Sequence, residues 1–340
     1  MSADEAGPLE KESGAAAILG FRTFMNPFTR RQFIRAAAVG CVAAASRGAL
    51  AANSTARKMT IDLMCGAIGV SAGQIEAIDL AARHGFESVG ADAQYLASLS
   101  SEQLTELKAT LKVKRLVFGA ANLPVEFRQD ESRLAEGLKS LPAIATGLQR
   151  AEVKRISTWL SPCDGRLTYL QNFRQHANRL RKIALILKDH ELRLGLEYVG
   201  PRTSWTRGRY PFIHTMAEMK DLIAEINTRN VGFLLDSWHW YHAGDSAADL
   251  LSLKAEDVVA VDLNDAPAGI SKDQQMDNRR ELPAATGVID LKSFLNALNQ
   301  IGYDGPARSE PFNQALNKMS KDDACAASAA ALKKAFALLD

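Results

Sequence analysis

The stretch Gly232-Phe-Leu-Leu-Asp-Ser-Trp-His-Trp-Tyr-His-Ala-Gly-Asp245 decides how the rest of this sequence is interpreted. It continues an apolar run over residues 231–235, which has the length and branching of a buried strand. Asp236 ends the run, and His239 follows in what we expect to be the next loop. A carboxylate at the end of a buried strand is typical of parallel α/β barrels, whose active sites lie at the carboxyl ends of the strands. The structural alternative is an Asp that caps a helix, followed by a surface His.

Apolar runs alternate with helix-period segments from Met59 to the C-terminus. The expected strands are residues 61–67, 87–91, 115–120, 153–159, 192–198, 231–236, 258–263 and 306–310. The expected helices are residues 74–84, 102–111, 130–151, 170–189, 215–228, 245–253, 291–301 and 321–338. This pattern predicts an α/β protein with a single (β/α)8 TIM barrel. An open doubly wound sheet is the alternative, but no Gly-x-Gly-x-x-Gly turn follows an early strand.

The N-terminal segment resembles a twin-arginine export signal. Arg30 and Arg31 are followed by Phe33 and Arg35, then by an Ala-rich apolar run and a small-x-small cleavage site at 49–51. The apolar run is too short for a permanent membrane anchor. We therefore expect an export signal at 1–51, a linker at 52–58 and the barrel at 59–340. This predicts a periplasmic or secreted protein that uses the twin-arginine machinery. A basic amphipathic arm is the alternative interpretation.

The charge of the mature chain argues against nucleic acid as a partner. Residues 1–51 contain six of the 41 Lys and Arg residues and four of the 39 Asp and Glu residues, which leaves 35 of each. The basic balance of the whole chain therefore comes from the signal. Cys65, Cys163 and Cys325 remain, without a CxxC spacing, and we expect free buried thiols.

Four of the expected strands end in acidic residues, namely Glu197, Asp236, Asp262 and Glu310. Each has a plain structural interpretation as an ion-pair partner, a cap or a rim charge. Four carboxylates that converge on one barrel mouth, however, repel one another unless a cation neutralises them. A divalent metal is the simplest solution. An oxygen-rich ligand set favours Mn²⁺ or Mg²⁺, with Zn²⁺ or Co²⁺ as alternatives.

From Thr60 to the C-terminus the sequence resembles the xylose isomerase-like barrel superfamily of sugar isomerases and epimerases. The matching motifs are Gly195-Leu-Glu197, Leu235-Asp236-Ser-Trp-His239, Val261-Asp262-Leu-Asn264-Asp265 and Ile301-Gly-Tyr-Asp-Gly305, which leads to Glu310-Pro-Phe312. The Asp-x-x-His element and the Glu-Pro-Phe end are the most specific parts.

The resemblance implies metal ligands at Glu197, Asp236 and Glu310. It implies that His239 binds or polarises the substrate, and that Glu197 and Glu310 act as a general acid/base pair. The family usually has His where this chain has Asp262. We expect Asp262 to ligate in its place, which makes an all-carboxylate site. The alternative is that this position no longer binds metal.

Two loops are expected to supply substrate contacts. Family members often place an Arg after the seventh strand to hold a substrate oxygen, and in the insert 266–288 we expect this to be Arg280, with Arg279 second. A solvated charged loop is the alternative. The loop 200–214 mixes Arg with aromatic residues, which suits a lid over a polyol or a subunit contact in a homo-oligomer. His242 is expected to line the same mouth.

The predicted function is that of a metal-dependent isomerase or epimerase acting on a sugar or keto-sugar by proton transfer next to a carbonyl. The same chemistry followed by loss of a β-substituent gives a lyase or dehydratase acting on an inosose or a 3-keto-glycoside. A non-catalytic exported sugar-binding barrel is a third possibility. Barrel endonucleases of abasic DNA need a multi-His zinc cluster, and six His residues in all, few at strand ends, argue against that class.

Overall fold

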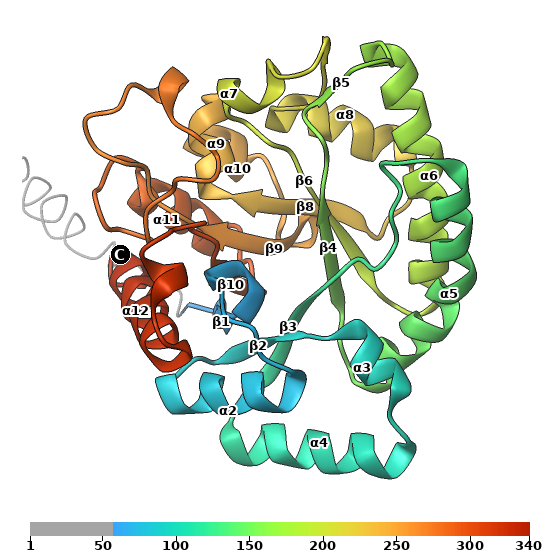
Figure 1. The fold of residues 1–340 in the computed structure, drawn as a ribbon, viewed down its shortest axis with the longest axis vertical. Coiled ribbons are helices and arrows are strands. Elements are labelled where there is room, and N and C mark those ends of the chain that lie inside the picture. The colour runs from blue at the N-terminus through green and yellow to red at the C-terminus, as the bar shows by residue number, and fades with distance from the viewer. Residues whose placement is uncertain (1–56) are drawn as a thin grey trace, which may run out of the picture. The chain divides into compact units, whose positions relative to one another are not determined.

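A computed structural model describes residues 57–340. The predicted export signal lies outside these described residues. Eight parallel strands form a closed barrel: β1 (Thr60–Leu63), β2 (Ser88–Ala91), β3 (Val117–Asn122), β4 (Arg155–Trp159), β6 (Arg193–Glu197), β8 (Val231–Asp236), β9 (Val258–Leu263) and β10 (Pro306–Ser309). β1 pairs with β10, so the first and last strands close the ring (Figure 1). The predicted TIM barrel is confirmed.

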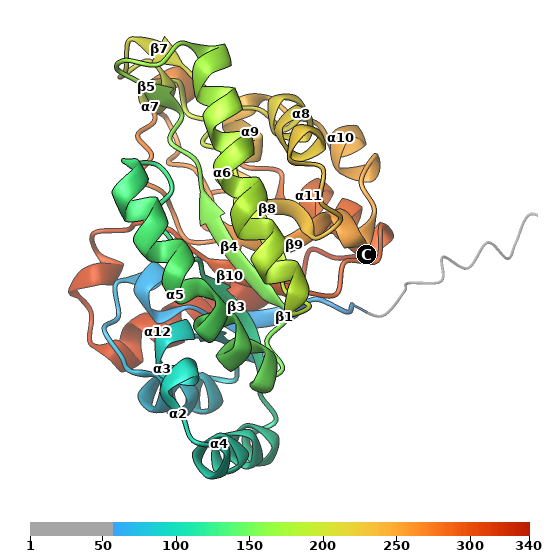
Figure 2. The same ribbon diagram turned by 90° about the vertical axis from the view of Figure 1, so that its right-hand side faces the viewer.

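Helices follow the strands and surround the barrel in both ribbon views (Figures 1 and 2). They are α2 (Gln74–His84), α3 (Ala93–Ser98), α4 (Ser101–Lys114), α5 (Glu131–Arg150), α6 (Tyr169–Asp189), α7 (Arg202–Trp205), α8 (Met216–Ile226), α9 (Ser237–Ala243), α10 (Ala247–Leu251), α11 (Leu291–Gln300) and α12 (Lys321–Phe336). Within residues 57–340 we find no helix whose length and apolar character would let it cross a membrane.

Local signals set the helix ends. Gly85 ends α2 at φ 72°, a left-handed conformation that glycine adopts without steric cost. A capping box of Ser100 and Gln103 begins α4, and Arg115 ends it at φ 57°. The following strand therefore begins at Val117, two residues later than predicted. The first strand ends at Leu63 rather than at residue 67, because η1 (Cys65–Ile68) turns the chain in a 3-10 helix.

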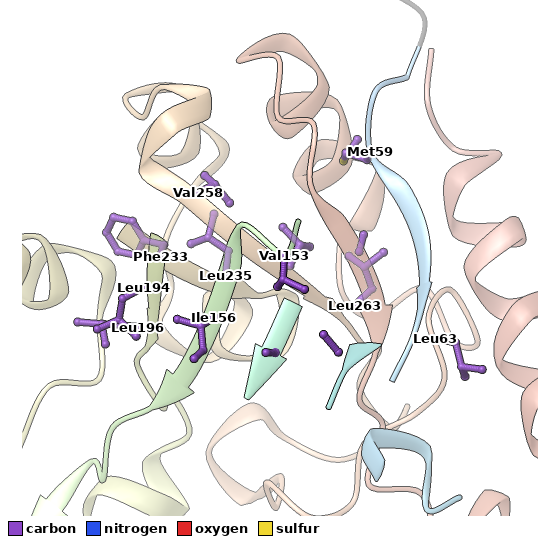
Figure 3. Packing of buried hydrophobic residues seen from close by; sticks show 14 of the residues in the cluster. Met59, Leu63, Val153, Ile156, Leu194, Leu196, Phe233, Leu235, Val258 and Leu263 are labelled. Atoms are coloured by element: carbon purple, nitrogen blue, oxygen red, sulfur yellow. The ribbon is translucent and has the colours of Figure 1, made fainter. Parts of the chain in front are cut away.

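Strand residues alternate between a helix-facing layer and the barrel interior. Side chains such as Leu194 and Leu196 on β6 belong to the large apolar cluster, part of which Figure 3 shows. A separate small cluster of Ala120, Leu234 and Ala260 is also buried. Two residues beyond Leu234 and Ala260, on the same faces, come acidic side chains. The interior thus changes from small apolar residues to charges toward the carboxyl ends of the strands.

Short elements after β4 and β6 extend the wall of the barrel mouth. β5 (Cys163–Asp164) and β7 (Tyr210–Pro211) pair antiparallel, and α7 lies between β6 and β7 in the chain. The sequence pattern did not predict these elements, nor α3 and α9. The cysteines among the described residues are free, as expected.

Candidate metal and acid/base site

Four buried or partly buried carboxylates meet at the carboxyl end of the barrel. Glu197 and Asp236 are the last residues of β6 and β8, Asp262 lies in β9, and Glu310 directly follows β10. One oxygen from each lies within 4.8 Å of one from every other. The predicted set is therefore brought together, and this all-oxygen cluster has the donors that a hard divalent cation takes.

The turn after β8 places His239 beside this cluster. Asp236 caps α9, since its Oδ1 accepts the Trp238 N–H at 2.8 Å. His239 therefore lies on a helix and not in the loop that the sequence suggested. Its Nε2 lies 3.7 Å from Asp236 Oδ2 and 3.9 Å from Glu197 Oε1. Its Nδ1 accepts the Gly200 N–H at 3.2 Å, and its Nε2 lies 3.4 Å from Arg280 Nη2, a group that can only donate.

Arg280 reaches into the same cluster and is buried. Its Nη1 donates to Asp236 Oδ2 at 2.7 Å and to Glu310 Oε2 at 3.3 Å. Nη2 donates to Asp277 Oδ1 and Nε to the Asp277 carbonyl, both at 2.9 Å. The guanidinium also lies over the Phe312 ring, 4.6 Å from its centroid. Arg280 thus lines the cleft, as predicted, but its N–H groups are bound to the surrounding carboxylates.

A second buried arginine binds the carboxylate of β9. Arg308 Nε and Nη2 donate to the two oxygens of Asp262 at 2.5 Å and 3.1 Å. The two residues are register partners on β10 and β9. Asp62 on β1 is the register partner of Arg308 on its other side, and burial raises its pKa to about 6. The sequence analysis singled out neither Asp62 nor Arg308.

Burial sets the electrostatics of the acid/base pair. Burial, then the charge of Glu310, raises the pKa of Glu197 well above its usual value. Burial, then the charge of Asp262, raises the pKa of Glu310 to about 8. Burial raises that of Asp236 to about 6, against the opposing charge of Arg280. Burial lowers the pKa of His239 to about 3, which keeps the ring neutral.

A cleft of about 670 Å³ opens over these groups. Its lining includes Trp159, Glu197, His239, Arg280, Glu310 and Phe312. Trp159 is 47% exposed and Phe312 is 39% exposed, which is unusual for large aromatic side chains. Phe312 also has φ 42°, a strained conformation for a bulky residue. Neither was predicted as a site residue, although Trp159 ends an expected strand and Phe312 ends the Glu-Pro-Phe motif.

His242 and Arg279 lie apart from the reactive groups. The ring of His242 is tilted against Trp238 and meets Tyr241 edge to face, with ring centroids 4.3 Å and 5.1 Å away. Burial lowers its pKa to about 4. It is not among the residues that line the described cleft, whereas Arg279 lines a smaller neighbouring pocket with Arg280. The geometry thus supports His239 and Arg280 over these two as groups that contact a ligand.

Comparison with known proteins places this site in a family. The family model described as "Xylose isomerase-like TIM barrel" matches residues 78–335. The chain belongs to this family. A xylose isomerase domain protein from Alicyclobacillus acidocaldarius superimposes with a TM-score of 0.72 at 29% identity, over 82% of this chain and 99% of that one. An IolI protein with a bound zinc atom superimposes with a TM-score of 0.67 at 19% identity, over 82% and 98%.

Two curated relatives of this family member are named as an isomerase and a dehydratase. Inosose isomerase from Bacillus licheniformis is 26% identical over 148 residues, which is 42% of this chain and 49% of the relative. The alignment thus spans about half the length of that relative. A 3-dehydroshikimate dehydratase from Pseudomonas aeruginosa is 27% identical over 137 residues, 40% of this chain and 20% of the relative.

Proposed function

We propose that this protein is a divalent-metal-dependent isomerase or epimerase that moves a proton at a carbon next to the carbonyl group of a sugar or keto-sugar. The observation that carries the proposal is the meeting of Glu197 and Glu310. Their carboxyl groups come from different strand ends, approach within 4.8 Å, and line the same cleft. Burial raises the pKa values of both, so both keep a proton at higher pH than an exposed carboxyl group does.

The donor set suits Mn²⁺ or Mg²⁺, because the oxygens are hard ligands. A divalent cation at this cluster would polarise the carbonyl and stabilise the negative charge that develops on its oxygen. One of the two glutamates takes the proton from the substrate carbon and the other returns it. His239 places Nε2 beside Glu197 and Asp236, where it can contact a substrate oxygen.

The cleft supports a cyclic polyol or keto-sugar as the ligand. Trp159 and Phe312 each have one ring face against an arginine, since Arg128 lies 4.6 Å from the Trp159 centroid and Arg280 lies 4.6 Å from the Phe312 centroid. Their exposure leaves aromatic surface at the cleft for the C–H face of a sugar ring. The carboxylates and His239 then contact its oxygens.

A lyase or dehydratase is the second candidate. The similarity to a relative named 3-dehydroshikimate dehydratase favours it. The first step is the same proton abstraction, and a substituent on the neighbouring carbon leaves instead of the proton returning. The products separate the two reactions, because only the lyase forms a double bond.

The test is exchange of the substrate proton with solvent. Keto-sugars and inososes are incubated with the Mn²⁺-loaded protein in D₂O, and deuterium at the carbon next to the carbonyl is followed by NMR. We expect Glu310→Gln and Glu197→Gln each to lower the exchange rate by about 10²-fold or more. Glu256→Gln is the matched control, because Glu256 is exposed and pairs with Lys254 far from the cleft. A Glu310→Gln variant with full exchange refutes the acid/base role.

We also propose that the protein is exported in folded form through the twin-arginine route and acts in the periplasm or outside the cell. The support is the Arg30-Arg31 segment and the short apolar run that follows it. The test is fractionation of cells that make the wild type or the Arg30→Lys/Arg31→Lys variant. We expect the variant to stay in the cytoplasm, and equal export of both would refute the proposal.

A further inference from the structure

We propose that Asp262 is not a metal ligand in this protein, because Arg308 holds both of its carboxylate oxygens, and that Glu197, Asp236 and Glu310 alone supply the protein's metal ligands. This inference rests on the proposed function only for the presence of a metal. It replaces the sequence-based expectation that Asp262 takes the place of the family's histidine.

The contact between Arg308 and Asp262 is a two-point ion pair. Nε donates to Oδ1 at 2.5 Å and Nη2 donates to Oδ2 at 3.1 Å. Both side chains are buried, so water does not compete for these hydrogen bonds. A metal ion that took an oxygen of Asp262 would have to share it with Arg308 and face the charge of Arg308 at close range.

The barrel framework fixes this pairing. Arg308 and Asp262 are register partners on adjacent strands, and their side chains point into the interior. On the other side of Arg308, Asp62 is its register partner. Gly119 leaves room for Asp62, because a Cβ at that position would come within 2.3 Å of Asp62 Oδ1. Arg308 therefore lies between two acidic residues in the barrel register, and its hydrogen bonds go to Asp262.

The other three carboxylates are freer to bind a cation. Glu197 Oε1 is buried and has no hydrogen-bond partner. Asp236 Oδ2 and Glu310 Oε2 share a single donor, Nη1 of Arg280. A cation would have to displace that one group to reach both oxygens, while Asp236 Oδ1 keeps its hydrogen bonds from the Trp238 N–H and Asn264 Nδ2. An unpartnered buried oxygen and two oxygens with a common donor form a better cation site than a carboxylate that is already matched.

The net charge of the site agrees with a ligand set that leaves out Asp262. An Asp and an Arg together carry the same net charge as a neutral histidine, so the pair leaves the total charge of the site unchanged. The pair supplies no ligand atom to the metal, however, so more coordination positions are left to solvent and substrate oxygens.

The test is Mn²⁺ binding, followed by electron paramagnetic resonance and calorimetry on the full-length protein purified without metal. The decisive variant is the double substitution Asp262→Asn with Arg308→Gln, which removes both charges together and keeps polar side chains. We expect its Mn²⁺ affinity to stay within about threefold of the wild type. Glu197→Gln should weaken binding more than about tenfold, because it removes a ligand, and loss of a mere hydrogen-bond partner of a ligand already costs 10–100-fold. Arg308 and Asp262 hydrogen-bond to each other, so the double variant takes away no such partner.

The single variant Arg308→Gln gives a second readout. It frees the oxygens of Asp262, so we expect Mn²⁺ to bind more tightly, by about tenfold, and water-proton relaxation to fall as a solvent position is lost. Circular dichroism checks that each variant is folded.

If the double variant loses as much Mn²⁺ affinity as Glu197→Gln does, the inference is refuted and the proposed function stands. A wild-type protein that binds no divalent cation would refute both.

Discussion

Replacing Arg280 by Met should strongly destabilise the metal-free protein. Arg280 is buried and donates to Asp236, Asp277 and Glu310. Removing one partner of a buried ion pair leaves an uncompensated charge, which typically costs 3–5 kcal/mol. Because Glu310 has a pKa of about 8 and is largely neutral, the loss falls mainly on the two aspartates. We therefore expect a decrease of about 3 kcal/mol in the free energy of unfolding.

The assay is urea unfolding at pH 7 with EDTA, followed by circular dichroism. Arg202→Met is the matched control, because Arg202 also pairs with an aspartate, Asp273, at 2.9 Å, but both side chains are exposed. An exposed pair contributes about 0–1 kcal/mol, so the control should change little. Equal unfolding energies for the two variants would contradict the structural role of Arg280.

A divalent cation should restore part of the lost stability. With the guanidinium gone, Asp236 Oδ2 and Glu310 Oε2 are open, and a ligand at 100 times its Kd stabilises the native state by about 2.7 kcal/mol. We expect Mn²⁺ to stabilise Arg280→Met by about this amount and Arg202→Met no more than the wild type. A variant that Mn²⁺ leaves unchanged would show that these oxygens do not form a cation site.

The remaining predictions concern pH, backbone space and ligand contact. Burial lowers the pKa of His176 from 6.5 to about 4, so the unfolded chain takes up a proton first as the pH falls. His176 should therefore lower the free energy of unfolding by about 2 kcal/mol between pH 7.5 and pH 5. In unfolding titrations, His176→Phe should lose this contribution to the pH dependence of stability. Gly200→Ala should destabilise by about 1–3 kcal/mol and lower activity, since its Cβ would lie 2.4 Å from the carbonyl oxygen of His239. Gly165→Ala, whose Cβ meets nothing within 4 Å, should behave like the wild type in thermal melts. Trp159→Ala should raise KM about tenfold with little change in kcat in steady-state kinetics, and an unchanged KM would remove its role as a sugar platform.

Much of the barrel could be predicted because its strands are buried on both faces and appear in the sequence as apolar runs. The strands 231–236 and 258–263 and the helix 74–84 agree with the structure residue by residue. The strand-end acids could be predicted for the same reason, since parallel strands bring their carboxyl ends to one mouth. Short elements such as α9 and the β5–β7 pair were missed, because two to seven residues give too little periodicity to distinguish a short helix or strand from a loop.

The partner of Asp262 could not be predicted from the sequence. Arg308 lies 46 residues away, and its contact with Asp262 depends on the register between β9 and β10. In the sequence Arg308 is one basic residue in a short strand that ends at a more conspicuous glutamate. Trp159 was equally hidden, because the last residue of an apolar run is expected to be buried. How far the Trp159 side chain is exposed depends on the loops around it.

The charged row inside the barrel constrains the order in which this sequence can change. Asp62, Arg308, Asp262 and Asp236 are successive register partners on four adjacent strands. If Asp262 becomes His first, Arg308 loses its two-point partner; if Arg308 becomes apolar first, Asp262 is left as a buried anion without a counter-charge. Either single step passes through a less stable protein, so the two positions are epistatic. A change from this barrel to one with a histidine at position 262 therefore avoids a destabilised intermediate only if both positions change together.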